Sequence, residues 1–218
     1  MSGDLGPGPH TKVRRLPEKA NYDAETIFAI LDAAPYVTVA GVVDGVAMAQ
    51  PTLAGRDATR LYVHGSRSNA VLRAALDARS ASVSATLFDG IRVARSGFES
   101  SVAYRSAVVV GPVSLVDGEE HDRALDLILD AALPGRSLEV RPATEREKSL
   151  TLVLCLDIEE GSAKISTGPT DDPEDDLASP VWGGVLPARL VFDEPLPDNR
   201  GVIGLPVPAS VRKRQQRG

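Results

Sequence analysis

The sequence is short of several residue types, and each shortage excludes a class of protein. Cys155 is its only cysteine, so an intramolecular disulfide framework is excluded, and its apolar surroundings, LTLVLCLDI, favour a buried hydrophobe over a nucleophile. Lys and Arg number 24 against 30 Asp and Glu, and the net charge of −6 argues against a general nucleic-acid binder. No apolar run approaches the length that spans a membrane, and no basic, apolar leader opens the chain. We therefore expect a cytoplasmic protein without a nucleic-acid or membrane partner.

Several motifs of common functional sites are also missing. The sequence has no G-x-G-x-x-G fingerprint, no P-loop and no G-x-S-x-G nucleophile elbow. His10, His64 and His121 have no metal-ligand spacing, and we expect His121 to be solvated. The acidic run DDPEDD (171–176) lacks the glycine turn and terminal glutamate of a calcium loop, which favours a solvated loop. We expect no metal site.

What the sequence does contain is a series of hairpins interrupted by helices. YDAETIFAILDAA (22–34) predicts an amphipathic helix with Asp23 as its N-cap, and EEHDRALDLILDAAL (119–133) predicts another. The dipeptides Asp44-Gly45 and Asp89-Gly90 each lie between apolar runs and predict tight turns. SLTLVLCLDIEEGSAKIS (149–166) predicts one long strand.

Six or seven strands of this kind predict an α+β fold, an antiparallel sheet or barrel with peripheral helices. Residues 1–15 are rich in Gly and Pro and predict an unordered N-terminal segment. Residues 16–190 then form one domain. Residues 191–218 form a proline-rich arm that ends in the basic tail VRKRQQRG, which we expect to be disordered.

The stretch LYVHGSRSNAVLRAAL (61–76) predicts a strand that ends at His64, a Gly65-Ser66 turn, and a helix over 67–79. A helix that starts near Ser66 or Ser68 leaves backbone N–H groups free, and its dipole attracts an anion. The alternative, a serine N-cap that binds nothing, stays open. The side chains available to an anion are Ser66, Arg67, Ser68, Asn69 and Arg73.

Two further stretches suggest ligand contacts. Arg95, Tyr104 and Arg105 flank a polar loop, either as surface residues of a hairpin or as partners of an aromatic anion. Trp182, the single tryptophan, lies among Pro and Gly in SPVWGGVLP, which is typical of a lid or interface anchor, with a core position as the alternative.

Five stretches, in order from about residue 15 to 188, resemble the pyridoxamine 5′-phosphate oxidase-like family, in its flavin-nucleotide-binding branch with the FMN-binding split barrel. They are RLPEKANYDAETIFAILDA, LYVHGS, SATLFDGIRVARSGFESSVAYRSAVVVG, PGRSLEVRPATEREKSLTLVLCLDIEEGSAKISTGP and DDPEDDLASPVWGGVLP.

The resemblance implies a homodimer of split β-barrels that holds FMN in two grooves between its subunits. The family's phosphate-binding turn corresponds to His64, Gly65 and Ser66 and the helix start after them. Its ring-contacting strand corresponds to Thr86 and Leu87, and its groove residues to Arg95, Ser96, Tyr104 and Arg105. Trp182 would come from the partner subunit.

Two departures from the family pattern bear on the cofactor. The branch reads HGSxxSR, whereas this chain reads HGSRSNA, so Asn69 and Ala70 replace Ser-Arg. A lost charge-assisted hydrogen bond costs about 1.5–3 kcal/mol, or roughly ten- to a hundredfold in affinity, which Arg67 would partly offset. The family's FHHS is FESS here, so Glu99 and Ser100 replace two histidines, which disfavours histidine-based haem ligation.

The leading hypothesis is an FMN-binding oxidoreductase in which the flavin carries the chemistry. Oxidation of pyridoxamine 5′-phosphate itself is disfavoured, because PVWGGVLPARLVF offers Arg189 alone where a basic pair would hold a second phosphate. Two alternatives stay open. One is a split-barrel dimer without flavin that acts as a binding or sensor protein, and the other is a different cofactor, a deazaflavin or haem, in the same groove.

Overall fold

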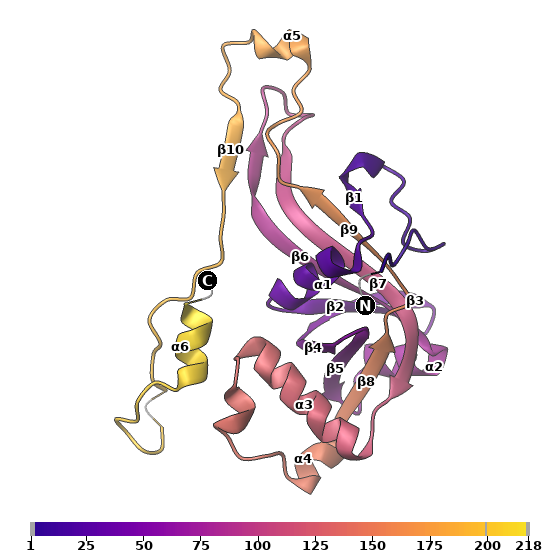
Figure 1. Ribbon diagram of the computed structural model, residues 1–218, viewed down its shortest axis with the longest axis vertical. Helices are drawn as coiled ribbons and strands as arrows, with labels where there is room; N and C mark the ends of the chain where they lie inside the picture. The colour runs from indigo at the N-terminus through magenta and orange to yellow at the C-terminus, as the bar shows by residue number, and fades with distance from the viewer. Residues whose placement is uncertain (1–2, 199, 217–218) are drawn as a thin grey trace. The chain divides into compact units, whose positions relative to one another are not determined.

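The computed structural model describes residues 3–198 and 200–216, which form two compact units (Figure 1). Unit 1 consists of the described residues up to 37, with 82–110 and 159–189. Unit 2 consists of 38–81, 111–158 and the described residues from 190 onward. Two long strands, β6 (Ser80–Val93) and β7 (Ser101–Leu115), contribute residues to both units.

Unit 1 is built around β9 (Glu160–Ser166), which pairs antiparallel with β1 (Ala20–Asn21) and with the first part of β7. The strand β10 (Gly184–Pro187) runs antiparallel beside β6 (Figure 1). The predicted first helix is confirmed as α1 (Ala24–Ala33), and the Asp23 carboxylate accepts the Thr26 N–H at 2.8 Å as its N-cap. Ile27 of α1 is fully buried against β9. The unit's short helices are η1 (Pro17–Lys19) and α5 (Glu174–Leu177).

The N-terminal segment makes specific contacts, where the sequence predicts an unordered segment over 1–15. The Leu5 N–H donates to Tyr22 O, and Gly161 N–H donates to Leu5 O. The Glu160 carboxylate accepts the N–H groups of His10 and Thr11 and the Thr11 hydroxyl, and it pairs with His10 Nδ1 at 2.5 Å. These donors lower the pKa of Glu160. The partners lie about 150 residues apart, so composition alone could not reveal them.

Unit 2 contains the strand β8 (Thr151–Asp157), which pairs antiparallel with β5 (Arg60–Ser66) and with the end of β7. The other side of β5 pairs with β4 (Ala54–Asp57). The Asp44-Gly45 turn is confirmed between β2 (Val37–Val43) and β3 (Val46–Thr52), with φ positive at both residues.

Helix α3 (Gly118–Ala132) covers β4 and β5 and closes the core of unit 2. The core side chains are those of Tyr62, Val116, Ala124, Ile128, Val153 and Cys155, so the cysteine is a buried hydrophobe as expected. The unit also holds α2 (Ala70–Ala78), η2 (Arg136–Leu138), α4 (Glu145–Leu150) and α6 (Ala209–Gln215).

The α+β class with antiparallel strand pairing is confirmed, and the described residues form ten strands where six or seven were expected. Short strands such as β1, β4 and β10 lack the apolar runs that sequence patterns detect. The predicted long strand over 149–166 is wrong, because it divides at Ile158 and Glu159 into β8 and β9, which belong to different units. No helix in the described part of the chain is long and apolar enough to cross a membrane.

Asp89-Gly90 is not a turn, which corrects the second hairpin prediction. Strand β6 continues through both residues. Gly90 has φ of 145°, and a Cβ atom there would lie 2.3 Å from Leu186 O on β10. The glycine therefore serves the close approach of β10 to β6.

The basic tail forms a helix in its described part, whereas we expected disorder. Ser210, in the first turn of α6, is buried and donates its N–H and hydroxyl to the Glu139 carboxylate at 3.0 and 2.6 Å. Arg214 lies over the Phe192 ring at 5.0 Å. These contacts place the described part of 191–218, predicted to be a separate arm, in unit 2. Residues 217 and 218 of the predicted tail lie outside the described range.

Candidate functional site

The loop between β5 and α2 satisfies most of its own backbone donors. The helix begins at Ala70, later than predicted, and Asn69 is the N-cap whose Oδ1 accepts Leu72 N–H at 3.1 Å. Arg67 N–H donates to Leu150 O at 3.2 Å, and Ser68 N–H donates to Ser66 Oγ at 3.3 Å. An anion at this loop would therefore depend on side chains more than on backbone N–H groups.

Gly65 and His64 have local structural roles in the same loop. A Cβ atom at Gly65 would lie 2.9 Å from Leu72 Cδ1, so the glycine lets the loop close against α2. The buried Nδ1 of His64 has no hydrogen-bond partner within the described residues. Burial lowers the pKa of His64, so its imidazole is neutral at pH 7.

Two arginines supply the positive charge beside this loop. Arg67 and Arg73 line a cavity of about 280 Å³ together with Leu76, Asp77, Leu115 and Leu152. Arg67 precedes the helix, so it does not share a helix face with the position of the missing family arginine. In the part of the chain that the structure describes, neither guanidinium has a hydrogen-bond or ion-pair partner. The cavity thus combines two available cations with three leucine side chains and one carboxylate, that of Asp77.

The predicted groove arginines of unit 1, in contrast, are paired within the protein. Arg95 Nη1 lies 3.0 Å from Asp172 Oδ2, and Arg95 N–H donates to Asp172 Oδ1 at 2.7 Å. Arg105 donates from Nε and Nη2 to both oxygens of Asp89 at 2.9 and 2.6 Å, which raises its pKa. An anion would have to compete with these carboxylates, so both side chains are better suited to positioning their neighbours.

The other predicted groove residues lie on β6, on β7 and in the loop that joins them. Ser96 Oγ accepts Glu99 N–H at 3.2 Å and so folds this loop. On β6, Thr86 is exposed and Leu87 is half-buried. Tyr104, on β7, is half-buried and faces Ser166 of β9 in the pairing register.

Sequence reasoning missed Arg92, whose side chain is 4% exposed. It donates to Ser166 Oγ at 3.1 Å and to Pro169 O, and it pairs with Asp171 at 2.9 Å. The sequence signal that could have revealed its burial is the alternation of β6, in which every second side chain points inward and Arg92 occupies one of these inward positions. The Asp172 side chain of the acidic run is buried and pairs with Arg95, whereas Asp171, Glu174 and Asp175 are exposed, as expected for a solvated run. Within 3–198 and 200–216, no group of acidic, His and Cys side chains could hold a metal ion.

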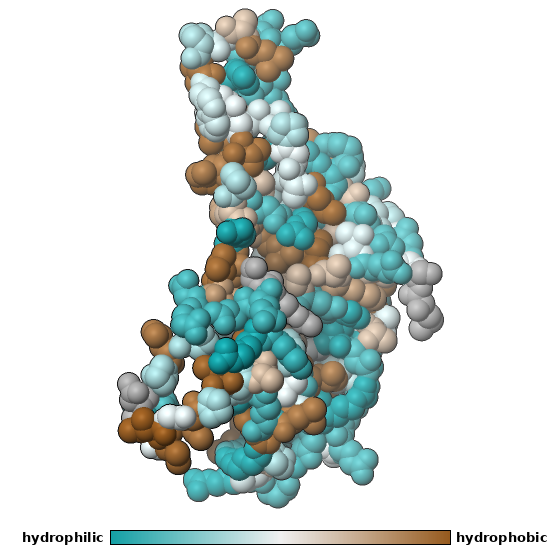
Figure 2. All heavy atoms as spheres, turned by 60° about the vertical axis from the view of Figure 1, so that its left-hand side comes forward, coloured by the Kyte–Doolittle hydropathy of each residue, from teal (hydrophilic) through white to brown (hydrophobic). Residues whose placement is uncertain are grey.

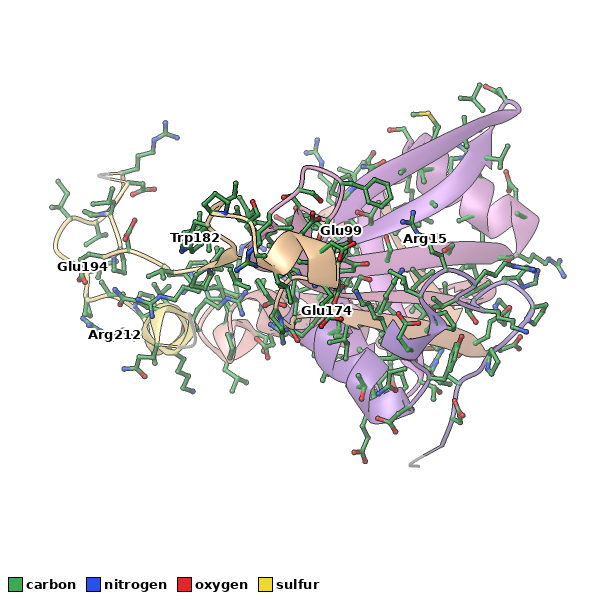
Figure 3. The ribbon with its side chains drawn as sticks, turned by 90° about the horizontal axis from the view of Figure 1, so that it is seen from above. Arg15, Glu99, Glu174, Trp182, Glu194 and Arg212 are labelled. Carbon is green, nitrogen blue, oxygen red and sulfur yellow. The ribbon has the colours of Figure 1, made fainter. Side chains whose placement is uncertain are left out.

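Trp182 lies between α5 and β10, with its side chain 66% exposed (Figure 3). A Cβ atom at Gly183 would lie 2.7 Å from Arg95 Nη1, and one at Gly184 would lie 2.9 Å from the Trp182 ring. The pair of Arg95 and Asp172 therefore sets the position of the segment that carries Trp182.

The family model for pyridoxamine 5′-phosphate oxidase matches residues 23–165 of this chain. The chain belongs to this family. Two solved structures are similar over nearly their whole length. The flavocytochrome Anf3 from Azotobacter vinelandii is 35% identical, with 95% of this chain and 97% of that chain covered and a TM-score of 0.88. The FAD and heme binding protein from Mycobacterium smegmatis is 38% identical, with 90% and 97% covered and a TM-score of 0.85. No match is found among curated proteins.

Family membership confirms the resemblance seen in the sequence and the split-barrel fold that it implies. Ala70, where the family branch has arginine, is the first residue of α2. Arg73 follows three residues later on the same helix, a spacing that places two side chains next to each other on the helix surface. Arg73 is thus the structural candidate to replace the missing family arginine.

Loss of the Asp172 carboxylate should release the Trp182 segment. In Asp172→Ala, Arg95 loses its ion pair, so we expect faster acrylamide quenching of tryptophan fluorescence, which reports on Trp182 alone. Asp175→Ala removes an exposed carboxylate from α5 nearby and should leave quenching at the wild-type rate. Equal quenching in all three proteins would show that Arg95 does not position this segment.

Proposed function

We propose that the protein is a flavin-binding oxidoreductase that works as a homodimer and holds the flavin phosphate at the β5–α2 loop. The observation that carries the proposal is the pair of unpartnered arginines, Arg67 and Arg73, in the cavity beside this loop. The two relatives described as a flavocytochrome and as an FAD and heme binding protein support a flavin. FMN, the cofactor predicted from the sequence, is the simplest flavin with a phosphate for this site.

The side chains of the loop fit a phosphate group. Ser66 Oγ and Ser68 Oγ lie 2.9 Å apart and exchange a hydrogen bond, so one hydroxyl proton is available to an acceptor. The guanidinium groups of Arg67 and Arg73 supply charge-assisted donors, while Asn69 fixes the start of α2. A bound flavin would supply the electron or hydride transfer, and these residues would bind and orient it.

The residues that the family resemblance gives for the flavin ring keep that role in the proposal. Thr86 and Leu87 would contact the ring, with Ser96 and Tyr104 on its border. Arg95 and Arg105 would act through Asp172 and Asp89 by holding Trp182 and β6 in place. None of these residues forms an acid–base pair, so the protein is not assigned a proton-transfer role.

Exposed apolar side chains on the C-terminal arm support the homodimer. They are brown in Figure 2, and such an apolar surface is typical of an interface with another copy of the chain. The arm's large exposed apolar side chains are those of Val191, Phe192, Leu196, Val202, Ile203 and Leu205, and Leu190 just before it is exposed as well.

The absorption spectrum of the purified protein tests the proposal. We expect a yellow protein with two flavin bands, a flavin that heat releases, and a dimer mass in analytical ultracentrifugation. A colourless protein that leaves the fluorescence of added FMN unchanged would contradict flavin binding and favour the binding or sensor alternative. A monomer would contradict the dimer.

Haem is a second candidate cofactor, favoured by the unpartnered Nδ1 of His64 and by the two relatives. Glu99 and Ser100, at the positions of the family's histidine pair, cannot replace imidazole ligands. His64 is neutral because burial lowers its pKa, and neutral imidazole is the form that binds iron. An intense Soret band that disappears in His64→Ala would support haem, and its absence from the wild-type protein would contradict it.

A further inference from the structure

Unit 2 contains a second, larger cavity that the proposed flavin site leaves unused. It has a volume of about 520 Å³, within the range of small-molecule pockets. Its walls come from the end of β7, the first turn of α3, helix α4 and the start of β8, all of which belong to unit 2. A small organic molecule therefore has room in this cavity within a single unit.

The lining of this cavity has an excess of negative charge. Two of its carboxylates, those of Asp122 and Glu145, pair with Lys148 at 2.6 and 3.1 Å. Asp117 and Glu119 also line the cavity, and among the described residues their carboxylates have no partner. Asp117 occupies the N-cap position of α3, but its side chain accepts none of the helix N–H groups. The N-terminus of α3 adds about half a positive charge, which is less than one carboxylate, so this end of the cavity favours a cation.

Arg67 does not cancel this excess. In the part of the chain that the structure describes, it is the one cation of the lining without a partner, and it faces the two free carboxylates of Asp117 and Glu119. Arg67 also lines the smaller cavity, where the phosphate of the proposed function would neutralise it. The free charge left in the larger cavity is therefore negative.

His121 supplies a buried acceptor in the same wall, which corrects the prediction of a solvated histidine. The residue is 8% exposed, and its Nε2 lies 3.3 Å from Thr151 O. A carbonyl oxygen only accepts, so Nε2 carries the proton and Nδ1 is an acceptor. The Nδ1 atom lies 3.9 Å from Asp122, beyond hydrogen-bond distance, and it is not sealed among protein atoms. Among the described residues no donor reaches this acceptor, so it is available to a ligand with an N–H group.

The chemistry of these acceptors fits an organic ammonium group better than a metal ion. Within the described residues, no group of acidic, His and Cys side chains could hold a metal ion. A primary ammonium group has three N–H donors, and its hydrogen bonds to carboxylates are charge-assisted. Leu115 and Val116 also line the cavity and supply apolar surface for a carbon chain.

We propose that the larger cavity binds a small organic cation, a primary ammonium group on an apolar carbon chain. The ammonium group donates to the carboxylates of Asp117 and Glu119 and to Nδ1 of His121, and the carbon chain lies against Leu115. The site belongs to unit 2 alone and needs no flavin, so it does not depend on the proposed function.

Isothermal titration calorimetry of the purified full chain with three matched probes tests the inference. Hexylamine, which is protonated at pH 7, 1-hexanol and hexanoate share a carbon chain and differ in charge. At low ionic strength we expect hexylammonium to bind at least about tenfold more tightly than either of the other probes. Asp117→Asn and Glu119→Gln should each weaken hexylammonium several-fold, because each removes one negative charge, and should leave 1-hexanol unchanged.

The control is Asp126→Asn, which removes an exposed carboxylate from α3 outside the cavity lining and should keep the wild-type affinity for hexylammonium. Equal affinities for hexylammonium and 1-hexanol, or tighter binding of hexanoate, would overturn the assignment of a cation site. An equal loss of affinity in Asp126→Asn and Glu119→Gln would also overturn it, because the net charge of the protein would then explain the binding. A colourless protein that still binds hexylammonium in this way would contradict the flavin proposal and leave the cation site intact.

Discussion

Gly55→Ala should destabilise the protein by about 1–3 kcal/mol, because β4 and α3 approach too closely for a methyl group. A Cβ atom at Gly55 would lie 2.6 Å from Ile128 N and from Leu127 C. These are backbone atoms of a helix, so no side-chain rotation relieves the overlap, and α3 must move away from the sheet. Urea unfolding of wild type and variant, monitored by circular dichroism, measures the difference.

The matched control is Gly97→Ala. A Cβ atom at Gly97 has no neighbour within 4 Å, and neither glycine has positive φ, so the two substitutions change backbone entropy alike. We expect Gly97→Ala to unfold at or slightly above the wild-type urea concentration. If Gly55→Ala unfolds at the same concentration as its control, then β4 and α3 do not have the spacing described here.

Loss of the two free arginines should cause the largest change in ligand affinity. Arg67→Ala and Arg73→Ala each remove a charge-assisted donor from the flavin phosphate, which costs about 1.5–3 kcal/mol, or roughly ten- to a hundredfold in Kd. Neither guanidinium has a protein partner within the described residues, so folding stability should stay near that of the wild type. Titration with FMN at fixed ionic strength measures the loss.

Riboflavin, which has the same ring and no phosphate, separates a phosphate contact from a general disturbance of the site. Its affinity should be equal for wild type and both variants. Arg146→Ala removes an exposed arginine from α4 and should change neither affinity. An equal loss for FMN and riboflavin would place the arginines elsewhere than on the phosphate.

Features that depend on neighbouring residues were predictable. The Asp23 side chain caps a helix three residues away, and the Asp44-Gly45 dipeptide supplies positive φ at two adjacent positions. The same dipeptide at Asp89-Gly90 failed as a predictor because pairing with β10, almost a hundred residues later, keeps β6 extended.

The residues of the candidate site also fall into those that the sequence could predict and those that it could not. The sequence identified the turn after His64 and the arginines near it, because strand, glycine and helix follow one another within a few residues. The sequence could not show that the guanidinium groups of Arg95 and Arg105 already pair with carboxylates of the same chain. Asp172 lies 77 residues from Arg95, and Asp89 lies 16 residues from Arg105. The burial of His121 likewise depends on β8, whose Thr151 lies 30 residues further along the chain.

The sequence by itself determined the α+β class, the family and the position of the loop between β5 and α2, which we propose as the phosphate site, because these follow from short-range patterns of apolar, glycine and polar residues. Only the tertiary structure decided which charged side chains are free. A charge is available to a ligand when no opposite charge lies beside it, and the folded chain brings Asp172 to Arg95 and Asp89 to Arg105 while it leaves Arg67 and Arg73 unpaired among the described residues.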